Sequence, residues 1–253
     1  MVRRAGLAAA ALMLAAACGA ATPTATTEDV VADAPMVDGE RYRYELVDAD
    51  GDLIGHGELS TRLEGSRWVL EQRYQGVAEA GETPSTDFTT LAVDAATLKP
   101  FGGLREATRV NDDGEAEGES YDWGYLEGSG ADRLESSRNR DGDVDEGELR
   151  LREHYYDNES SLWLWRALDF DVELDLNYVS VNALDRTQQT VNLRAPAVET
   201  IEVPAGTFET WRLIVRNGRA VRSAWVNVDA PHQVVQWDNG DVVFRLESSE
   251  LPQ

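Results

Sequence analysis

The sequence predicts a mainly β protein built as one large curved antiparallel sheet, a half-open barrel, with one short helix. Apolar and polar residues alternate through most of the chain, as at Tyr42, Tyr44 and Leu46 in RYRYELVD. This period of two places apolar side chains on one face of a strand. Turn-forming Asp-Gly and Asn-Gly pairs recur between the alternating segments, and helical periodicity is scarce. Strands joined by tight turns are typical of an antiparallel sheet with one solvated face.

The N-terminal half is interpreted as a series of hairpins. Asp50 and Gly51 lie between the first two alternating segments, and this pair favours a tight turn. Trp68 and Leu70 share one face of the next segment, which the turn-rich GVAEAGETPS follows. The expected strands of this half are RYRYELVD, ELSTRLEG, SRWVLEQRY, TDFTTLAVD, GLREATRV, GESYDWGYLEG, ADRLESSRN and GELRLREHYY.

One segment, YYDNESSLWLWRALDF, breaks the alternation and predicts a short helix near residues 159–168. Asn158 can cap its N-terminus. Leu162, Trp165 and Leu168 recur every third residue, which is typical of an amphipathic helix with a buried face. We expect the helix to pack against the curved sheet, and its apolar stripe favours a core role over that of a ligand gate.

The C-terminal third returns to long alternating segments. Pro204 and Gly206 in VPAGTF predict a turn, because proline pre-sets φ and glycine tolerates a positive φ. Asn-Gly pairs in RNGR and WDNGDVV predict two further hairpins. The expected strands are VELDLNYVSVNALD, QTVNLRAPAVETIEV, FETWRLIVRNG, AVRSAWVNVD, HQVVQWD and DVVFRLES.

The same C-terminal segments carry a family resemblance. ETIEVPAGTFETWRL, followed by SAWVNVDAPHQVVQWDNGDVVFRLES, resembles an uncharacterised family of secreted and lipoprotein-type bacterial domains of unknown function. In that family a Pro-x-Gly-Thr-Phe turn precedes a strand, and a tryptophan-bearing strand and a final hairpin follow. The likeness extends over residues 39–250 and is strongest from Tyr155 onward. Members resemble the half-open barrels of the periplasmic lipoprotein carriers, so the resemblance implies a fold and no defined activity.

The first 17 residues, MVRRAGLAAAALMLAAA, are typical of a secretory signal peptide. The apolar run is too short to span a bilayer comfortably. The chain has one cysteine, Cys18, directly after this run. The stretch resembles the lipobox of bacterial lipoproteins, with the usual leucine displaced by one place to Leu14. The resemblance implies that Cys18 is the lipidated mature N-terminus. The alternative is ordinary cleavage that leaves a free thiol.

These features predict the domain organisation and the location. Residues 18–38 lack aromatic residues and are rich in Ala, Thr, Pro and Asp, so we expect a disordered tether. Residues 39–253 are then a single antiparallel β domain. We expect an exported protein anchored by its lipidated N-terminus, in the outer membrane facing the periplasm or on the outer face of the cell membrane. The membrane is therefore the expected partner, through the N-terminal lipid, and the identity of any protein partner is unknown.

The charge excludes one class of ligand. The chain has 47 acidic and 23 basic residues, a formal net charge of −24. Nothing in it resembles the basic stripe that releases counterions from phosphates, so nucleic-acid binding is not expected.

The candidate metal-ligating residues match a known pattern poorly. Asp141, Asp143 and Asp145 alternate in NRDGDVDEGE, as in calcium loops that need glycine at the sixth position and a bidentate acid at the twelfth. Those positions hold Glu146 and Arg152. A solvated acidic hairpin loop is the better interpretation, and no metal site is predicted.

No catalytic residue and no cofactor is predicted. His56, His154 and His232 lack partners at zinc-ligand spacing. The sequence has neither a G-x-S-x-G elbow nor a glycine-rich phosphate loop. An enzyme, such as a hydrolase of unknown type, is therefore the third and least supported hypothesis.

The seven tryptophans are the remaining functional signal, although most are expected in the core. Trp163 and Trp165 are two residues apart, about 200° around a helix, so we expect one of them to face outward beside a cavity. With Leu162 they form the predicted site for a lipid or another small apolar molecule on the concave face. The alternative is a structural or protein-interaction component of the envelope, which binds a protein by strand addition at an open sheet edge.

Overall fold

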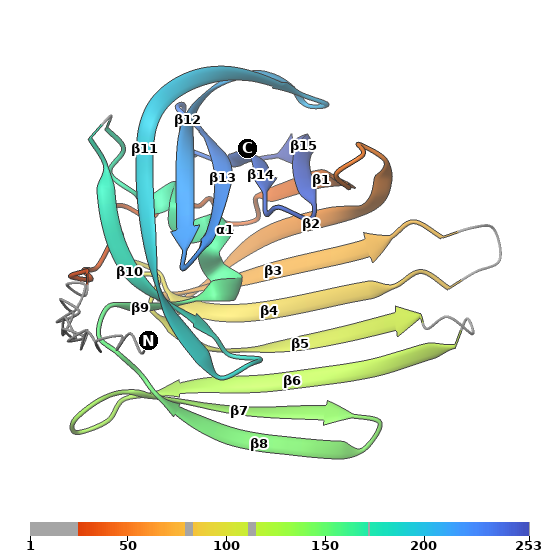
Figure 1. The fold of residues 1–253 in the computed structure, drawn as a ribbon, viewed down its shortest axis with the longest axis vertical. Coiled ribbons are helices and arrows are strands. Elements are labelled where there is room, and N and C mark those ends of the chain that lie inside the picture. The colour runs from red at the N-terminus through yellow and green to blue at the C-terminus, as the bar shows by residue number, and fades with distance from the viewer. Residues whose placement is uncertain (1–24, 79–82, 111–114, 172, 253) are drawn as a thin grey trace, which may run out of the picture.

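The computed structural model describes residues 25–78, 83–110, 115–171 and 173–252. Within these ranges fifteen strands form one curved sheet, in the order β8-β7-β6-β5-β4-β3-β2-β1-β15-β14-β13-β12-β11-β10-β9 (Figure 1). The strands are β1 (Arg41–Val47), β2 (Leu53–Glu64), β3 (Arg67–Gly76), β4 (Thr86–Asp94), β5 (Pro100–Val110), β6 (Ala116–Leu126), β7 (Arg133–Arg140), β8 (Asp143–Arg150), β9 (Tyr155–Asp157), β10 (Asp175–Asn182), β11 (Thr187–Val203), β12 (Gly206–Asn217), β13 (Ala220–Asn227), β14 (Val234–Asp238) and β15 (Val243–Glu250). The predicted fold class, a large curved sheet with one short helix, is confirmed.

Nearly all neighbouring strands are antiparallel. The first strand, β1, pairs with the last, β15, from Arg41 opposite Glu250 to Val47 opposite Val243. The exception is the short strand β9, which runs parallel to β10. The sheet therefore curls back on itself without closing, and its two edges are β8 and β9.

Alternate turns of an antiparallel sheet lie at opposite ends of its strands. The turns after β1, β7, β10, β12 and β14 lie at one end, which we name the mouth. The turns after β2, β4, β6 and β13 lie at the other end, which we name the base.

Pro204 and Ala205 form the turn between β11 and β12, and Gly206 begins β12 with a φ of 130°. This backbone conformation favours glycine because it has no Cβ.

Residues 25–38, named the strap, cross the base before β1 begins. The side chains of Val30 and Met36 are buried in the core. The Ala32 amide donates to the carbonyl of Ala167 at 2.8 Å. The predicted disordered tether is therefore wrong for residues 28–38. A few spaced apolar residues anchor the strap although its average composition is that of a linker.

Two base turns hold the strap from the other side. The Asp29 carboxylate contacts the Nζ of Lys99, in the turn after β4, and lies 3.3 Å from the Nδ1 of His154. The Lys99 ammonium also lies over the ring of Tyr156, 4.0 Å from its centroid. Cys18 and the predicted signal peptide lie outside the described residues.

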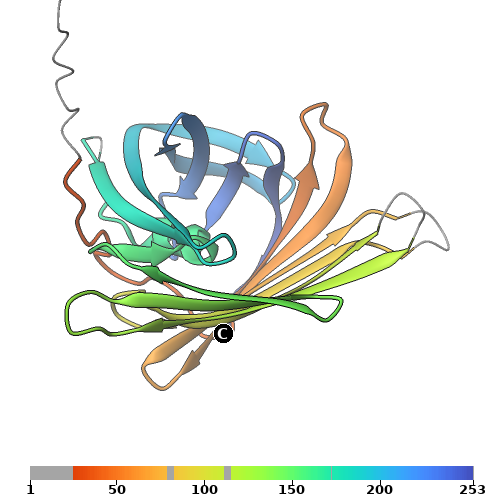
Figure 2. The same ribbon diagram turned by 60° about the horizontal axis from the view of Figure 1, so that its bottom comes forward.

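The predicted helix is present as three short consecutive turns: η1 (Asn158–Ser160), α1 (Ser161–Leu164) and η2 (Trp165–Ala167). Asp157, not Asn158 as predicted, caps it, with its side chain accepting from the Glu159 amide. Asp157 ends β9 with extended backbone angles, which is the conformation that an N-cap requires. The helix lies inside the curve of the sheet (Figure 2). No helix among the described ranges is both long and apolar enough to cross a membrane.

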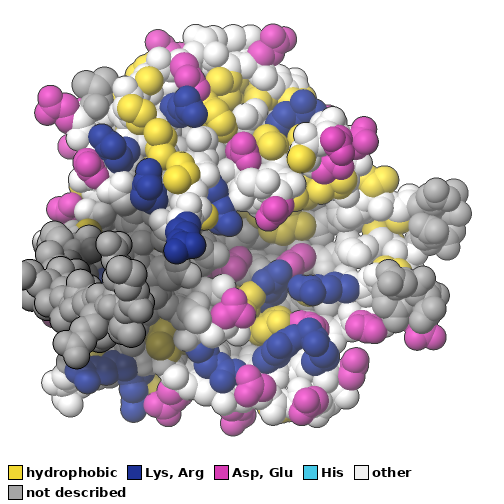
Figure 3. Space-filling view, viewed as in Figure 1, with side chains coloured by type: hydrophobic (Ala, Val, Ile, Leu, Met, Phe, Trp, Pro, Cys, Tyr) yellow, Lys and Arg dark blue, Asp and Glu magenta, His cyan; other side chains and the backbone are white. Residues whose placement is uncertain are grey.

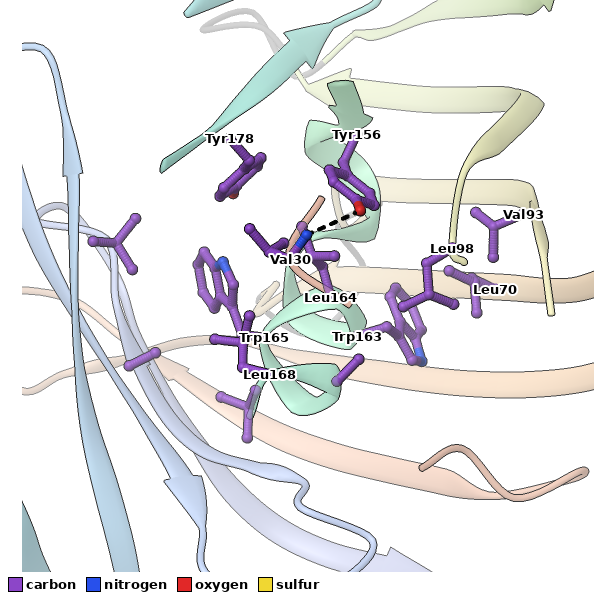
Figure 4. Close-up of a cluster of buried hydrophobic side chains, with 14 of the residues drawn as sticks. Val30, Leu70, Val93, Leu98, Tyr156, Trp163, Leu164, Trp165, Leu168 and Tyr178 are labelled. Atoms are coloured by element: carbon purple, nitrogen blue, oxygen red, sulfur yellow. Dashed lines mark hydrogen bonds between the residues drawn. The ribbon is translucent and has the colours of Figure 1, made fainter. Parts of the chain in front are cut away.

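The two helical tryptophans are both buried, with Trp163 1% and Trp165 3% exposed. Figure 4 shows Trp163 pointing toward Leu70 and Leu98, while Trp165 points to the opposite side of the helix. The expectation that one of them faces outward is therefore wrong. The helical spacing does separate them, but the sheet wraps around the helix and covers both sides.

On the face shown in Figure 3, acidic and basic side chains are interspersed. Acidic and basic side chains of neighbouring strands form ion pairs, such as Arg43 Nε with Glu58 Oε2 at 3.2 Å. Pairs of this kind neutralise part of the acidic charge locally on the outer surface.

Candidate functional site: an inner cavity at the mouth

A cavity of about 260 Å³ lies between the helix and the inner faces of β3 and β10 to β15. Its lining residues lie in the mouth half of these strands and on the first turns of the helix. The apolar lining is Leu162, Trp165, Val191, Val215, Trp237 and Phe244, with the rings of Tyr74 and Tyr178. The polar lining is Gln72, Asn158, Glu159, Ser161, Ser180, Asn217, Arg222 and Asn239.

Aromatic side chains form the apolar part of the wall. The rings of Trp165 and Trp237 lie 4.7 Å apart between centroids at an angle of 59°. Phe244 meets Tyr74 edge to face, with 5.7 Å between the ring centroids. Such a wall offers flat apolar surface and few rotatable bonds, which suits the binding of an apolar group.

The helix N-terminus brings a carboxyl group to the cavity. Burial, and after it the neighbouring Asp157 carboxylate, raise the pKa of Glu159 to about 7, against the guanidinium of Arg105, which acts in the opposite direction. Glu159 is half-buried. At neutral pH its charge is therefore partial, unlike that of an exposed glutamate.

The side chain of Asp157 fixes the start of the helix that carries Glu159. Its Oδ2 accepts from Trp123 Nε1 at 2.8 Å and from the Tyr125 hydroxyl at 2.7 Å. Its Oδ1 accepts the Glu159 amide at 2.8 Å. Burial raises the pKa of Asp157 to about 6, although these three hydrogen bonds lower it. Asp157 thus ties β6 to the helix and positions Glu159.

Two polar atoms of the lining lack a hydrogen bond of good geometry within the described part of the chain: Trp165 Nε1 and Asn217 Oδ1. Trp165 Nε1 lies near the Tyr178 hydroxyl, without the alignment of a hydrogen bond. A buried polar atom without a partner costs free energy, so these atoms are candidates to bind a ligand's polar group.

The structure brings together two of the three residues predicted for the apolar site. Leu162 and Trp165 line the cavity. Trp163 does not, because it packs on the other side of the helix against the core of the base (Figure 4).

The candidate calcium residues lie far from this cavity, in the hairpin of β7 and β8. Asp141 is in the turn, with a φ of 52°, and Asp143 and Asp145 lie on β8. Asp145 pairs with Arg186, from the turn between β10 and β11. In the ranges that the structure describes, no three metal-ligating side chains converge.

The histidines are separate from one another and from the cavity. His56 Nδ1 lies 3.7 Å from Glu247 Oε2 on the outer face, and His154 contacts the strap. His232 Nδ1 lies 3.1 Å from the carbonyl oxygen of Asn227 at the base.

Sequence reasoning missed several residues of the lining, chiefly Arg222, Trp237 and Phe244. For Arg222 a signal exists in AVRSAWVNV. Its strand buries Ala224 and Val226, and Arg222 occupies the same alternating register. A charged residue in the apolar register of a strand indicates a functional position, because burial of an unpaired charge is costly.

Comparison with known proteins places the chain in an uncharacterised group. A family model described as a protein of unknown function, DUF3108, matches residues 41–247. No curated protein sequence gives a significant match.

Two solved structures are similar. One is a β-barrel-like protein of domain of unknown function DUF1849 from Brucella abortus, 13% identical with a TM-score of 0.56, covering 87% of this chain and 100% of that chain. The other is a candidate lipoprotein from Parabacteroides distasonis ATCC 8503, 11% identical with a TM-score of 0.34, covering 88% of this chain and 100% of that chain. The first likeness shows a shared barrel-like fold, and the second is too distant to support an argument.

Proposed function

The chain belongs to the DUF3108 family of proteins of unknown function, and from that premise we propose that it is a non-catalytic envelope lipoprotein that binds a small apolar or amphipathic molecule in its inner cavity. The cavity itself carries the proposal. It combines an aromatic wall with unpartnered polar atoms, which is the usual composition of a small-molecule site.

The size of the cavity limits the size of the ligand that it can hold. Its volume of about 260 Å³ lies just below the roughly 300–1,000 Å³ of typical ligand pockets. One short hydrocarbon chain or one small aromatic molecule fits such a volume. A lipid with several acyl chains does not fit unless the barrel opens.

A binding role agrees better with the lining than catalysis does. Glu159 is the one carboxyl group of the lining, and no histidine belongs to it. Ser161 and Ser180 therefore lack the imidazole base that commonly activates a serine nucleophile.

The alternative is that a protein partner adds a strand to the sheet, but the edge strand β8 is already protected against such pairing. The edge strand β8, DVDEGELR, is densely charged. Arg186 reaches from the turn after β10 to Ser136 Oγ and to Asp145. Charged, bridged edges disfavour pairing with another chain, so we prefer the cavity.

An anchor at Cys18 would orient the molecule. The strap is held at the base, by Lys99 and His154, and the cavity lies at the mouth. Six residues lie between Cys18 and Ala25, so the seven steps from one Cα to the next span at most about 25 Å. The base would then face the membrane, and the ligand would come from the aqueous side.

Binding of a neutral apolar fluorophore tests the proposed role. We expect N-phenyl-1-naphthylamine to bind the purified protein at one site with micromolar affinity and to accept energy from Trp165 and Trp237. Leu162→Trp fills the cavity and should weaken binding at least tenfold. Leu126→Trp, at an exposed position, is the matched control and should leave binding unchanged. Equal affinity of the two variants for the fluorophore, or no binding of the fluorophore by the wild type, would contradict the proposal.

Cell fractionation tests the anchor separately. We expect the wild-type protein in the membrane fraction and Cys18→Ser in the soluble fraction, because acyl chains supply the membrane affinity. Retention of Cys18→Ser in the membrane fraction contradicts lipidation at this residue.

A further inference from the structure

We propose that the ligand of the inner cavity is a single-chain anionic amphiphile, such as a medium-chain fatty acid, whose headgroup binds Arg222. This inference rests on the proposed function and specifies its ligand class. It follows from the position of Arg222, its lack of a partner, and the shape of the lining around it.

The sheet register directs Arg222 into the cavity. Arg222 on β13 stands opposite Val215 on β12, and both residues line the cavity. Cross-strand partners project from the same face of a sheet. Arg222, a half-buried residue, therefore lies at the mouth, on the same face as the buried side chains of Ala224 and Val226.

Among the residues that the structure describes, Arg222 has no anionic partner, although the chain carries 47 acidic residues. Elsewhere arginines pair readily, as Arg105 does with Asp87 and Arg245 with Glu45. Within the described ranges no ion pair or hydrogen bond involves the Arg222 side chain. An anionic headgroup would give this guanidinium the charge-assisted hydrogen bonds that it lacks.

A neighbouring side-chain amide completes a site for the headgroup. Asn217, at the end of β12, lines the cavity with one amide atom unpartnered. The two amide atoms can exchange places by rotation about the side chain, which turns the Nδ2 donor toward a carboxylate. Glu159, on the opposite helix wall, opposes an anion only weakly because its pKa is raised to about 7.

The rest of the lining fits the chain of the ligand. Trp165, Trp237 and Phe244 supply the apolar surface. The volume of about 260 Å³ lies just below that of typical ligand pockets, which suits a single hydrocarbon chain of medium length.

Calorimetric titration tests the inference, with decanoate below its micelle concentration and with decanol below its solubility limit. We expect decanoate to bind the wild-type protein at least tenfold more tightly than decanol. R222Q should remove this preference. Its affinity for decanoate should fall at least tenfold, while its affinity for decanol stays within twofold of the wild-type value. R222K should retain it, because the charge remains. R216Q, on the exposed outer face of β12, is the matched control and should behave like the wild type.

The outcomes separate this inference from the proposed function. Equal affinity for the two ligands in the wild type, or an unchanged preference in R222Q, overturns the anionic headgroup and leaves the cavity as an apolar site. Failure of both ligands to bind a folded protein overturns the proposed function as well.

Discussion

At the scale of single residues, the ion pair of Glu40 and Arg166 joins the residue directly before β1 to the helix. Arg166 Nη1 lies 2.6 Å from Glu40 Oε1, and Arg166 Nη2 lies 2.9 Å from Glu40 Oε2. The residues are 0% and 3% exposed, respectively. The Tyr42 hydroxyl donates to Glu40, and Arg166 donates to the carbonyl of Pro231. The helix is therefore held at the base by a fully satisfied polar network.

Replacement of Arg166 by methionine should lower the free energy of unfolding by about 3–5 kcal/mol, because it leaves the Glu40 carboxylate buried without its cation. Urea denaturation measures the change. The double variant R166M/E40Q should recover part of the loss, since no uncompensated charge remains. A loss below about 1 kcal/mol for R166M would show that the pair does not hold the helix.

Asp157 should make stability fall as the pH rises from about 4 to about 6. Its folded-state pKa of about 6 lies above the ordinary aspartate value of 3.8, so between these values the folded state keeps a proton that the unfolded state releases. The contribution is fully present below pH 4 and is lost as the pH passes 6. At 1.36 kcal/mol per pKa unit it amounts to about 3 kcal/mol.

The variant D157N should flatten this slope, as measured by urea denaturation at several pH values. It should also destabilise the protein at low pH, because asparagine has one acceptor oxygen for the three groups that donate to the two oxygens of Asp157. D94N is the control, because hydrogen bonds lower the pKa of Asp94 and it titrates below this range. An unchanged slope in D157N means that another group carries the pH dependence.

Local sequence identifies some of these residues and not others. The alternation in AVRSAWVNV is sufficient to mark Arg222 as a charged residue on an apolar face. Glu40 and Arg166 have no such signal, because the residues are 126 positions apart and only the packed helix brings them together. Asp157 and Asn158 are both good caps by residue type, and only the end of β9 decides between them.

At the scale of elements, the strap is part of the folded domain. Truncation of the buried Met36 to alanine should lower the free energy of unfolding by about 2–4 kcal/mol, through lost burial and the cavity left behind. Leu251→Ala, at a position 47% exposed, is the control and should change stability by less than about 0.5 kcal/mol. Equal effects of the two substitutions in urea denaturation would contradict docking of the strap.

The strands and turns are more predictable than the strap. Asn217-Gly218 and the turn after Asp238 lie where the turn chemistry predicts them, because hairpins are determined by neighbouring residues. The strap differs, because its apolar residues Val30 and Met36 are few and find their partners only in the folded base.

At the scale of the whole molecule, the cavity follows from the way in which the sheet curls around the helix. Strands β1 and β15, from opposite ends of the domain, pair and bring Phe244 beside Tyr74. Alternation in the sequence predicts which side chains face inward, but it does not predict that β1 pairs with β15. The lining of the cavity could therefore not be predicted from the alternation. The curl of the sheet around the helix also buries both Trp163 and Trp165.

The crystal structure of the protein with 10-bromodecanoate tests the central claim, that the inner cavity binds a single-chain ligand, most directly. We predict one anomalous bromine peak among Trp165, Trp237 and Phe244, with the carboxylate within hydrogen-bond distance of Arg222. A bromine peak on the outer surface alone, or an unoccupied cavity at saturating ligand, would contradict the account.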